Sequence, residues 1–536
     1  MQRIHTTAAH LFFRLPGAFL LLFIGMHPNG YAQQKTIVTI SIQQDPEPVD
    51  PMIYGQMLEN VNDSVIYGGV TDGNGNVLPH ITRLLKELDI PVMRWPGGTV
   101  IHEYRWRDGI GPRKLRPVVP TYAWKGKENY QFGTDEFLQW CKEINTQPYI
   151  NFNMANHPLY GGTLWEALDW IEYVNGNPDT TNGGRLRAAY GHKEPYKVQY
   201  WGIGNENYGP WGRHKEETAA GYGDRLAVWA GTIHSKYPEL HLLGVGHTAA
   251  WDSTVLEKSG QAIDYLTQHY YVVSKLKDGQ LQNPDNTLFA PAKMEAHLRL
   301  LSNLLGRYNK SKAGDPVRLC IDEWNNRHSV LENGEYKFTR QSPRRQFDVA
   351  VAAGMLNVFI RQSPVVGMAN YIFPVNGHGL IRTIGTNDAL KTPLFYLFKQ
   401  YRQWMTGSKL EVTVKGPGIT GAAAAATIDG DCKEIKTGNE QLTYIDAAAV
   451  RSSEKGIYIS LVNRSWNTGR EVAVTVPKGY KVTQTWEIAD QNINAFNSVT
   501  DRDVLIPKIR TVNNRKGSYS TKLLPCAVMI VKLVRM

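Results

Sequence analysis

Cysteine is scarce in this chain, with four residues among 536. No two of them have C-x-x-C spacing, and none stands beside histidine as in a zinc motif, which excludes a structural zinc site of that kind. Cys141 falls in a helical pattern and Cys320 in an apolar run, so we expect both to be small core residues. Cys432 and Cys526 could pair as a disulfide in an oxidising compartment, or remain two separate thiols.

Clusters of basic residues are also missing. The formal charge is +10 and the pI about 9.1, but Lys and Arg are spread along the chain and form no run of the kind that binds nucleic acid. Such a charge suits an acidic polysaccharide, or only favours solubility. The chain has neither an H-E-x-x-H sequence nor a glycine-rich phosphate or nicotinamide loop after a strand. We therefore expect no metal, no cofactor and no nucleic-acid partner.

Long apolar runs are absent except near the N-terminus. Arg3 and Arg14 precede the apolar run 18–24, and small residues follow it. This order of cationic, apolar and small residues predicts a cleavable signal peptide over residues 1–33. The run is too short to span a bilayer comfortably. We expect a protein exported to the periplasm or the medium, with no membrane attachment after the signal is removed.

Residues 50–405 alternate between short apolar runs and longer stretches with helical periodicity. The apolar runs predict eight strands, at 53–58, 90–95, 148–153, 198–204, 240–246, within 262–271, at 317–322 and at 365–373. Helical patterns occupy most of the intervals, at 81–88, 134–144, 163–174, 218–237, 292–308, 342–360 and 393–405. This alternation predicts an α/β protein with a (β/α)8 TIM barrel, whose active site lies at the C-terminal ends of the strands.

The pattern changes after the predicted barrel. Residues 406–536 contain short alternating runs separated by Gly, Asn and Pro, which predict a C-terminal antiparallel β-sandwich domain. Residues 34–49 contain one strongly alternating stretch, 35–45, which reads as a strand. Because this strand comes before any helix, we expect it to pair with the sheet of another domain, such as the sandwich.

Two glutamates stand at the ends of predicted strands. Y-W-G-I-G-N-E ends in Glu206 after the fourth strand, and C-I-D-E-W-N contains Glu323 after the seventh. A single glutamate is usually an exposed or ion-paired residue, but ionised carboxylates are seldom buried unless something uses or pairs them. Cleavage of a glycosidic bond needs an acid and a second carboxylate, which acts as a nucleophile or as a base. Two glutamates at one face of a barrel therefore predict a sugar-cleaving site.

Several stretches resemble the α-L-arabinofuranosidases of glycoside hydrolase family 51. Besides Y-W-G-I-G-N-E (200–206), they are I-Y-G-Q-M-L-E (53–59), M-R-W-P-G-G (93–98), Y-R-W-R-D-G-I-G-P (104–112), F-G-T-D-E-F-L-Q-W-C (132–141), E-A-L-D-W-I-E-Y-V-N-G (166–176), H-Y-Y (269–271) and D-E-W-N (322–325). The resemblance extends over about residues 50–405, whereas the C-terminal part matches only in general pattern. It implies a retaining enzyme that removes α-L-arabinofuranosyl residues from plant-type polysaccharides or oligosaccharides.

The resemblance also implies roles for individual residues. Glu206 would be the general acid/base and Glu323 the nucleophile of a double displacement, with the carboxyl groups about 5–5.5 Å apart. Residues expected to contact the sugar or support the carboxylates are Asn205 (to the 2-hydroxyl), Tyr271 (holding Glu323 ionised), His269, Glu59 (accepting from hydroxyls), Trp124 (an apolar wall) and Thr99. His269 as an ordinary core histidine and Trp124 as a loop anchor remain alternatives. By analogy with the family, a homo-oligomer is expected.

Three departures from the family pattern put the identity of the sugar in question. Thr99 follows the Pro-Gly-Gly turn where the family usually has Asn, Asn60 follows Glu59 where it usually has His, and residues 368–379 replace the usual Ala-Gln-x-Val-Asn run. We expect all three to lie near the subsite that recognises the sugar. The alternatives are the same mechanism on another furanoside, a β-xyloside or a β-glucan, or a non-catalytic carbohydrate-binding protein on the same fold.

Overall fold

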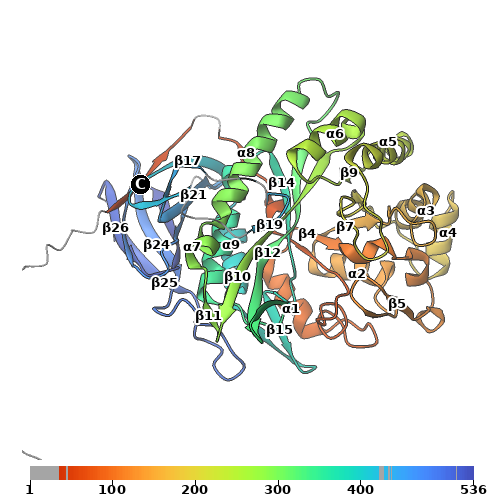
Figure 1. Cartoon of the computed structure of the whole chain (residues 1–536), viewed down its shortest axis with the longest axis horizontal. Coiled ribbons are helices and arrows are strands. Elements are labelled where there is room, and N and C mark those ends of the chain that lie inside the picture. The colour runs from red at the N-terminus through yellow and green to blue at the C-terminus, as the bar shows by residue number, and fades with distance from the viewer. Residues whose placement is uncertain are drawn as a thin grey trace, which may run out of the picture.

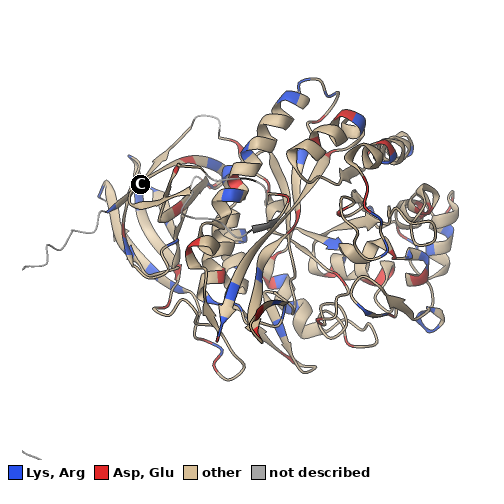
Figure 2. Cartoon of the chain, in the orientation of Figure 1, with Lys and Arg blue, Asp and Glu red and all other residues tan. Residues whose placement is uncertain are grey.

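The computed structural model describes residues 35–43, 46–421, 428–432, 435, 438–454, 456–514 and 516–536 (Figure 1). The predicted signal peptide, 1–33, lies outside the described residues. Among the helices that are described, none is both long enough and apolar enough to cross a membrane. Lys and Arg are interspersed with Asp and Glu over both parts of the molecule (Figure 2).

Eight parallel strands close into a barrel. In barrel order they are β3 (Gly55–Met57), β4 (Val92–Trp95), β7 (Gln147–Phe152), β8 (Tyr200–Ile203), β9 (His241–Gly244), β10 (Tyr265–Lys277), β12 (Arg318–Glu332) and β14 (Val366–Tyr371). The pairing of β10 with β12 and of β14 with β3 completes the closed circle. Each strand overlaps one of the predicted runs, and the predicted TIM barrel is confirmed.

Helices cover the outside of the barrel. They are α1 (Pro79–Leu88), α2 (Thr134–Ile144), α3 (Leu164–Asn175), α4 (Asn182–Ala189), α5 (Ala219–Lys236), α6 (Ala249–Ser259), α7 (Pro284–Leu288), α8 (Ala290–Tyr308), α9 (Gln346–Arg361) and α10 (Pro393–Trp404). A threonine side chain caps the starts of α3, α4, α5 and α6. At α3, for example, the Glu166 amide donates to Thr163 Oγ1 (3.2 Å), and the Thr163 amide donates to Glu166 Oε2 (2.8 Å).

The barrel interior is packed with side chains beneath the site. Six strands each contribute one residue to this layer: Val92, Tyr149, Leu243, Tyr265, Cys320 and Met368. Because both faces of a parallel barrel strand are covered, the strands read in the sequence as nearly continuous apolar runs. Cys141 and Cys320 are buried, as expected, and in the described part of the chain no disulfide joins Cys432 to Cys526.

The structure corrects several expectations for the loops. Helices α4 and α6 both fall in intervals for which no helix was predicted. Strand β12 does not end at Asp322 but continues to Glu332 and turns back through β13 (Glu335–Thr339). The extension was missed because its polar residues do not give an apolar run. This β12–β13 hairpin stands over the site.

The C-terminal domain consists mostly of antiparallel strands. They are β17 (Gly407–Lys415), β21 (Ile445–Arg451), β22 (Ile457–Asn463), β23 (Arg470–Thr475), β24 (Tyr480–Ile488), β25 (Lys508–Asn514), β26 (Ser518–Leu523) and β27 (Val528–Arg535). Strand β1 (Thr36–Ser41) lies between them, antiparallel to β17 and parallel to β23 (Figure 1). Strand β2 (Pro48–Val49) also pairs with β17. The N-terminal segment is thus part of the C-terminal domain.

The remaining strands in the described residues are short. They are β5 (Val119–Thr121), β6 (Gly126–Glu128), β11 (Gln280–Leu281), β15 (Ile381–Ile384), β16 (Asp388–Lys391), β18 (Gly418–Thr420), β19 (Ile428–Gly430) and β20 (Gln441–Thr443). Helix α9 is buried along nearly its whole length because it packs between the barrel and the C-terminal domain (Figure 1). Strand β19 follows β17 and β18 in sequence but pairs antiparallel with β10 of the barrel.

Candidate active site

A pocket of about 490 Å³ opens at the C-terminal ends of the barrel strands. Six of the residues predicted from the sequence line it: Glu59, Thr99, Trp124, Glu206, Tyr271 and Glu323. The other two, Asn205 and His269, lie buried directly behind this wall, in contact with Arg94 and Glu206. The structure thus brings all eight predicted residues together.

Glu206 lies in the turn after β8, with a backbone φ of +43°. Its Oε1 accepts hydrogen bonds from the Tyr208 hydroxyl (3.2 Å) and lies 2.8 Å from His269 Nδ1. Burial alone would raise the pKa of Glu206, but the hydrogen bond and charge of His269, with a contribution from Arg327, hold this pKa below its ordinary value.

Glu323 lies inside β12 and is held by two donors. Arg94 Nη1 is 2.8 Å from its Oε1, and the Tyr271 hydroxyl donates to its Oε2. His269 Nδ1 is 3.6 Å from the same Oε2. A Cβ atom on Gly98 would lie 2.3 Å from Oε1, so the second glycine of the Pro-Gly-Gly turn allows the backbone to approach this carboxylate closely.

A buried charge network lies beneath the two glutamates. Arg94 is fully buried, and its guanidinium reaches Asp322 Oδ2 (3.3 Å) and Asn205 Oδ1 (2.7 Å) as well as Glu323. His269 Nε2 lies 3.1 Å from Asp322 Oδ1. Burial would lower the pKa of His269, but the negative charges of Glu323 and Asp322 raise it well above the ordinary value. These surroundings therefore favour the cationic imidazole.

Arg94 and Asp322 were assigned no role from the sequence, although both stand in the motifs quoted above. The signal that could have identified them is a charged residue inside an apolar strand, since such a charge requires a partner. Burial would raise the pKa of Asp322, but Arg94 and His269 hold it below the ordinary value. Both residues are thus charged supports for the glutamates.

Glu59 and Trp124 form the opposite wall. Glu59 Oε1 accepts from the Val100 amide (3.0 Å) and from the Trp124 indole (2.8 Å). Burial is the main cause, and the negative charge of Glu323 the second, that raises the pKa of Glu59 to about 7. The ring of Trp124 lies 4.5 Å from the Arg340 guanidinium, so it is fixed at both its edge and its face.

Two of the three departures from the family pattern lie at the pocket. Thr99 lines it, and so do Ile372, Phe373 and His378 of the 368–379 segment. Asn60, the third, does not itself line the pocket, and its amide donates to Glu128 Oε2 (2.6 Å).

The β12–β13 hairpin adds residues that the sequence analysis did not foresee. Arg327 and Phe338 both line the pocket, and the Arg327 guanidinium lies 3.2 Å from the centroid of the Tyr271 ring. Arg340, just after the hairpin, pairs with Asp63 (3.0 Å). These side chains form a cationic and aromatic rim above Glu323.

Strand β19 brings Gly430 and Asp431 to the site, and neither was foreseen from the sequence. Asp431, just after β19, accepts from the His269 amide (2.6 Å) and lies 2.6 Å from His247 Nδ1. The His247 ring stacks on Tyr208 with centroids 3.6 Å apart. Gly430 lines the pocket with φ +94°, and a Cβ there would lie 2.2 Å from the His269 carbonyl oxygen.

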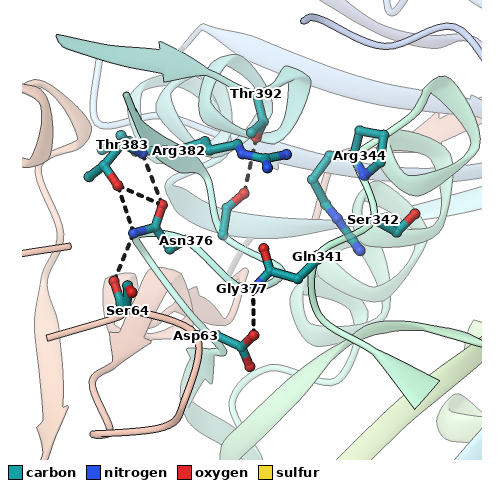
Figure 3. A pocket seen from close by; sticks show the side chains of 13 residues that line it. Asp63, Ser64, Gln341, Ser342, Arg344, Asn376, Gly377, Arg382, Thr383 and Thr392 are labelled. Carbon is teal, nitrogen blue, oxygen red and sulfur yellow. Dashed lines mark hydrogen bonds between the residues drawn. The ribbon is translucent and has the colours of Figure 1, made fainter. Parts of the chain in front are cut away.

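A separate polar cavity of about 200 Å³ lies beside the β12–β13 hairpin (Figure 3). Gln341 donates there to Asp63, and the Asn376 amide donates to the Ser64 carbonyl (2.7 Å). No residue predicted from the sequence to act in the site lines this cavity.

Among the residues that the structure describes, Glu206, His269 and Glu323 also form a group whose side-chain types could hold a metal ion. One atom from each lies within 4.8 Å of the others. These atoms already engage one another and the donors Tyr208, Tyr271 and Arg94, so the group is explained by hydrogen bonding without an ion. The chemistry of the set is that of two carboxylates bridged by an imidazolium.

Comparison with known proteins agrees with this geometry. Residues 84–287 match the model "Alpha-L-arabinofuranosidase 1 domain" and residues 322–526 the model "Alpha-L-arabinofuranosidase C-terminal domain". A probable α-L-arabinofuranosidase C of Aspergillus terreus is 31% identical over 88% of this chain and 92% of its own length. An intracellular exo-α-L-arabinofuranosidase of Bacteroides ovatus is 27% identical over 94% of this chain and 96% of its own.

Solved structures show the same fold. The α-L-arabinofuranosidase of Thermotoga maritima, in complex with arabinose, superposes with a TM-score of 0.79 at 27% identity, over 94% of this chain and all of that one. The family 51 enzyme of Thermotoga petrophila gives 0.79 at 26% identity, over 93% of this chain and all of that one. The chain therefore belongs to the α-L-arabinofuranosidases of glycoside hydrolase family 51, glycosidases that remove arabinofuranosyl residues.

Proposed function

We propose that this protein is an exported, retaining enzyme that removes terminal α-L-arabinofuranosyl residues from plant-type polysaccharides or oligosaccharides. The observation that carries the mechanism is the spacing of its two glutamates, which have carboxylate oxygens within 4.8 Å of each other. Retaining glycosidases hold their carboxyl groups about 5–5.5 Å apart, whereas inverting enzymes leave about 6.5–9.5 Å for a water molecule. The spacing supports double displacement.

Glu323 is the nucleophile in this proposal. Its carboxylate attacks the anomeric carbon and forms a covalent glycosyl-enzyme ester. Arg94 and Tyr271 support this role because both donate to the carboxylate and so hold it in place.

Glu206 is the acid/base, and it shares its proton with His269. The resting pair is an imidazolium beside a carboxylate. Movement of one proton along the 2.8 Å hydrogen bond from Nδ1 to Glu206 Oε1 gives a neutral imidazole and a carboxylic acid, which protonates the leaving oxygen. Asp322 supports the neutral tautomer by accepting the Nε2 hydrogen. The Glu206 carboxylate then deprotonates the water that hydrolyses the ester.

The remaining predicted residues bind the sugar. Asn205 Oδ1 is fixed by Arg94, while its buried Nδ2 has no hydrogen-bond partner within the described chain and is available to the 2-hydroxyl. Glu59 accepts from sugar hydroxyls, Trp124 packs against a ring face, and Thr99 faces the same space.

Another sugar is the second candidate. Thr99 and the 372–373 segment stand at the pocket where the family pattern differs, which favours a related or substituted furanoside, a β-xyloside or a β-glucan with the same two carboxylates. A non-catalytic binding protein is disfavoured because both glutamates are present with their supports.

The test is hydrolysis of aryl glycosides by the parent and by Glu206→Ala and Glu323→Ala. The panel contains α-L-arabinofuranoside, β-D-galactofuranoside, β-D-xylopyranoside and β-D-glucopyranoside. We expect release from the arabinofuranoside, its loss in Glu323→Ala, and rescue of Glu206→Ala by azide. Release from another glycoside alone would keep the mechanism and assign a different sugar specificity. If the folded protein hydrolysed none of the substrates, the proposed activity would be overturned.

Export is the part of the proposal supported only by the sequence of residues 1–33. N-terminal sequencing of the protein from the native cells, after separation of cytoplasm from periplasm and medium, tests it. A cytoplasmic protein that retains Met1 would contradict it.

A further inference from the structure

Three loops that follow neighbouring barrel strands meet beside the mouth of the active-site pocket. They are 96–133 after β4, 153–163 after β7 and 204–218 after β8. Large apolar side chains are exposed on them, with Tyr122 and Trp211 each 43% exposed and Leu159 76% exposed. Exposed aromatic groups that gather at one place on a soluble protein commonly mark a binding surface.

The aromatic groups are held in a fixed arrangement. Tyr122 and Tyr160 meet edge to face with centroids 5.6 Å apart. The Arg213 guanidinium stacks on both rings, 3.5 Å from the Tyr122 centroid and 4.8 Å from that of Tyr160. The guanidinium thus fixes the two rings relative to each other.

Hydrogen bonds stabilise the first loop internally and join the three loops to one another. Glu103 Oε1 accepts from the amides of Tyr122 (2.8 Å) and Ala123 (3.1 Å). His214 Nδ1 accepts from the Asn156 amide (2.9 Å), which joins the second loop to the third. His102 Nδ1 lies 3.0 Å from the Trp211 carbonyl oxygen, which joins the first to the third. The surface is therefore formed before any ligand arrives, which reduces the entropy lost on binding.

This surface is continuous with the catalytic pocket. Ala123, Trp211 and Gly212 line the catalytic pocket, while Tyr122, the neighbour of Ala123, lines an adjacent cavity of about 290 Å³. Leu159 and Tyr160 line the same outer cavity. The two spaces therefore adjoin at the peptide that links Tyr122 to Ala123.

We propose that Tyr122, Tyr160 and Trp211, with the cavity beside them, form an outer site for the neutral glycan chain that carries the arabinofuranosyl group. The C–H faces of sugar rings pack on aromatic rings, and Tyr and Trp also offer polar edges to hydroxyls. A chain seated here emerges next to Glu206, where the leaving group must stand. The inference rests on the proposed function and adds its substrate class: a polymer or long oligosaccharide in preference to a small glycoside.

Two measurements test the outer site, one with turnover and one without. The first compares kcat/KM on wheat arabinoxylan with kcat/KM on an aryl α-L-arabinofuranoside for the parent, Tyr122→Ala, Tyr122→Phe and Trp466→Ala. Loss of one aromatic contact is expected to lower the polymer-to-aryl ratio of Tyr122→Ala about tenfold. Tyr122→Phe keeps the ring and should keep the ratio. Trp466, 41% exposed on the C-terminal domain, is the matched control.

The second measurement is retardation of the same proteins in native gels that contain arabinoxylan, with dextran gels as the reference. Retardation of the parent, lost in Tyr122→Ala and kept in Tyr122→Phe, supports the outer site even if no glycoside is hydrolysed, so its outcome is separate from that of the proposed function. Thermal unfolding confirms that Tyr122→Ala is folded. An unretarded parent, or equal retardation and equal kinetic ratios in all variants, would overturn the proposal.

Discussion

His269 holds together charges that would otherwise repel. Three carboxylates, those of Glu206, Asp322 and Glu323, face its two ring nitrogens within 3.6 Å. A buried carboxylate without a partner is costly, and so is a buried imidazolium, but each offsets the other here. Arg94, one layer below, compensates the buried carboxylates of Asp322 and Glu323 in the same way. Each of the two glutamates proposed to act in catalysis is therefore paired with a cation that does not line the pocket.

Tyr271 provides the most direct residue-scale test of the nucleophile. Tyr271→Phe removes the hydroxyl that donates to Glu323 and leaves Arg94 in place. A hydrogen bond to a charged group is worth about 1.5–3 kcal/mol, so kcat/KM on the aryl arabinofuranoside should fall about 10- to 150-fold. Tyr270→Phe is the control, because the Tyr270 hydroxyl meets His297 in the core (2.9 Å). Equal losses of kcat/KM in the two variants would contradict the proposed support of Glu323 by Tyr271.

Glu59 gives a pH test. Its pKa is raised from 4.5 in the unfolded chain to about 7 in the fold, so the folded state holds the proton more tightly. Stability is therefore lost as pH rises from about 4.5 to about 7, by ~3 kcal/mol in total. Glu59→Gln keeps an oxygen acceptor for Val100 and Trp124 and removes this titration.

The measurement for Glu59 is thermal unfolding of the ligand-free protein at pH 4.5, 6 and 7.5. Glu59→Gln should gain stability relative to the parent as pH rises, whereas Glu143→Gln, at the exposed pair with Lys86, should follow the parent. Curves for Glu59→Gln and the parent that stay parallel would show that Glu59 keeps its ordinary pKa.

At the scale of elements, extensions of the barrel build the site. β12 runs nine residues past Glu323 before the hairpin turn, and β19 adds an antiparallel strand to β10 on the opposite side. These elements bring Arg327 and Asp431 to the pocket from regions that the repeating strand–helix pattern does not include. The barrel itself supplies the glutamates, and the additions complete their surroundings.

Asp431 tests the contribution of β19. Asp431→Asn weakens the contacts of residue 431 with His247 and with the His269 amide. His247 stacks on Tyr208, so Tyr208 and His269, the two neighbours of Glu206 Oε1, both lose a support. Hydrolysis of a phenyl arabinofuranoside, which needs a proton for its leaving group, should slow about tenfold or more. The 2,4-dinitrophenyl arabinofuranoside, whose leaving group needs little assistance, should slow less.

The readout for Asp431→Asn is the dependence of kcat/KM on the pKa of the leaving phenol, with the partly exposed Asp490→Asn on the C-terminal domain as the control. A steeper dependence than in the parent is expected. An equal loss on every leaving group would mean that Asp431 supports only the fold.

Sequence patterns identified the elements far better than the contacts between them. The eight strands and the two glutamates could be predicted, because parallel barrel strands are apolar runs and their ends share one face. The pairing of Arg94 with Asp322 joins residues 228 positions apart, and no local pattern reports it. The β12 extension was missed because Asn325, Asn326 and Arg327 are polar, and β19 because it follows the first strands of the next domain.

At the scale of the molecule, the barrel and the C-terminal domain share charged contacts. Arg361 at the end of α9 reaches Glu295 of α8 (2.7 Å) and Asp446 of β21 in the C-terminal domain (3.1 Å). Burial would raise the pKa of Glu295, but Arg361 lowers it to about 2. This ion triad is mostly buried, so its charges are screened less than those of a surface pair.

Arg361→Gln tests whether this triad couples the two parts. Removal of one partner from a buried pair leaves an uncompensated charge, and we expect a loss of about 3 kcal/mol in unfolding free energy at pH 7. Arg402→Gln, at the more exposed pair with Asp89, should cost less than about 1 kcal/mol. Urea unfolding followed by fluorescence and by circular dichroism measures both, and equal small losses would contradict the expectation.

The place where β19 joins β10 limits how this chain can be divided. A minimal enzyme cut after α10 would retain the closed circle of strands and both glutamates, yet it would lack Gly430 and Asp431. The same cut, made to exchange C-terminal domains between relatives, would import another protein's contact with His247 and His269. The modules of this protein therefore cannot be recombined at the barrel's last helix without altering the environment of Glu206, the proposed acid/base residue.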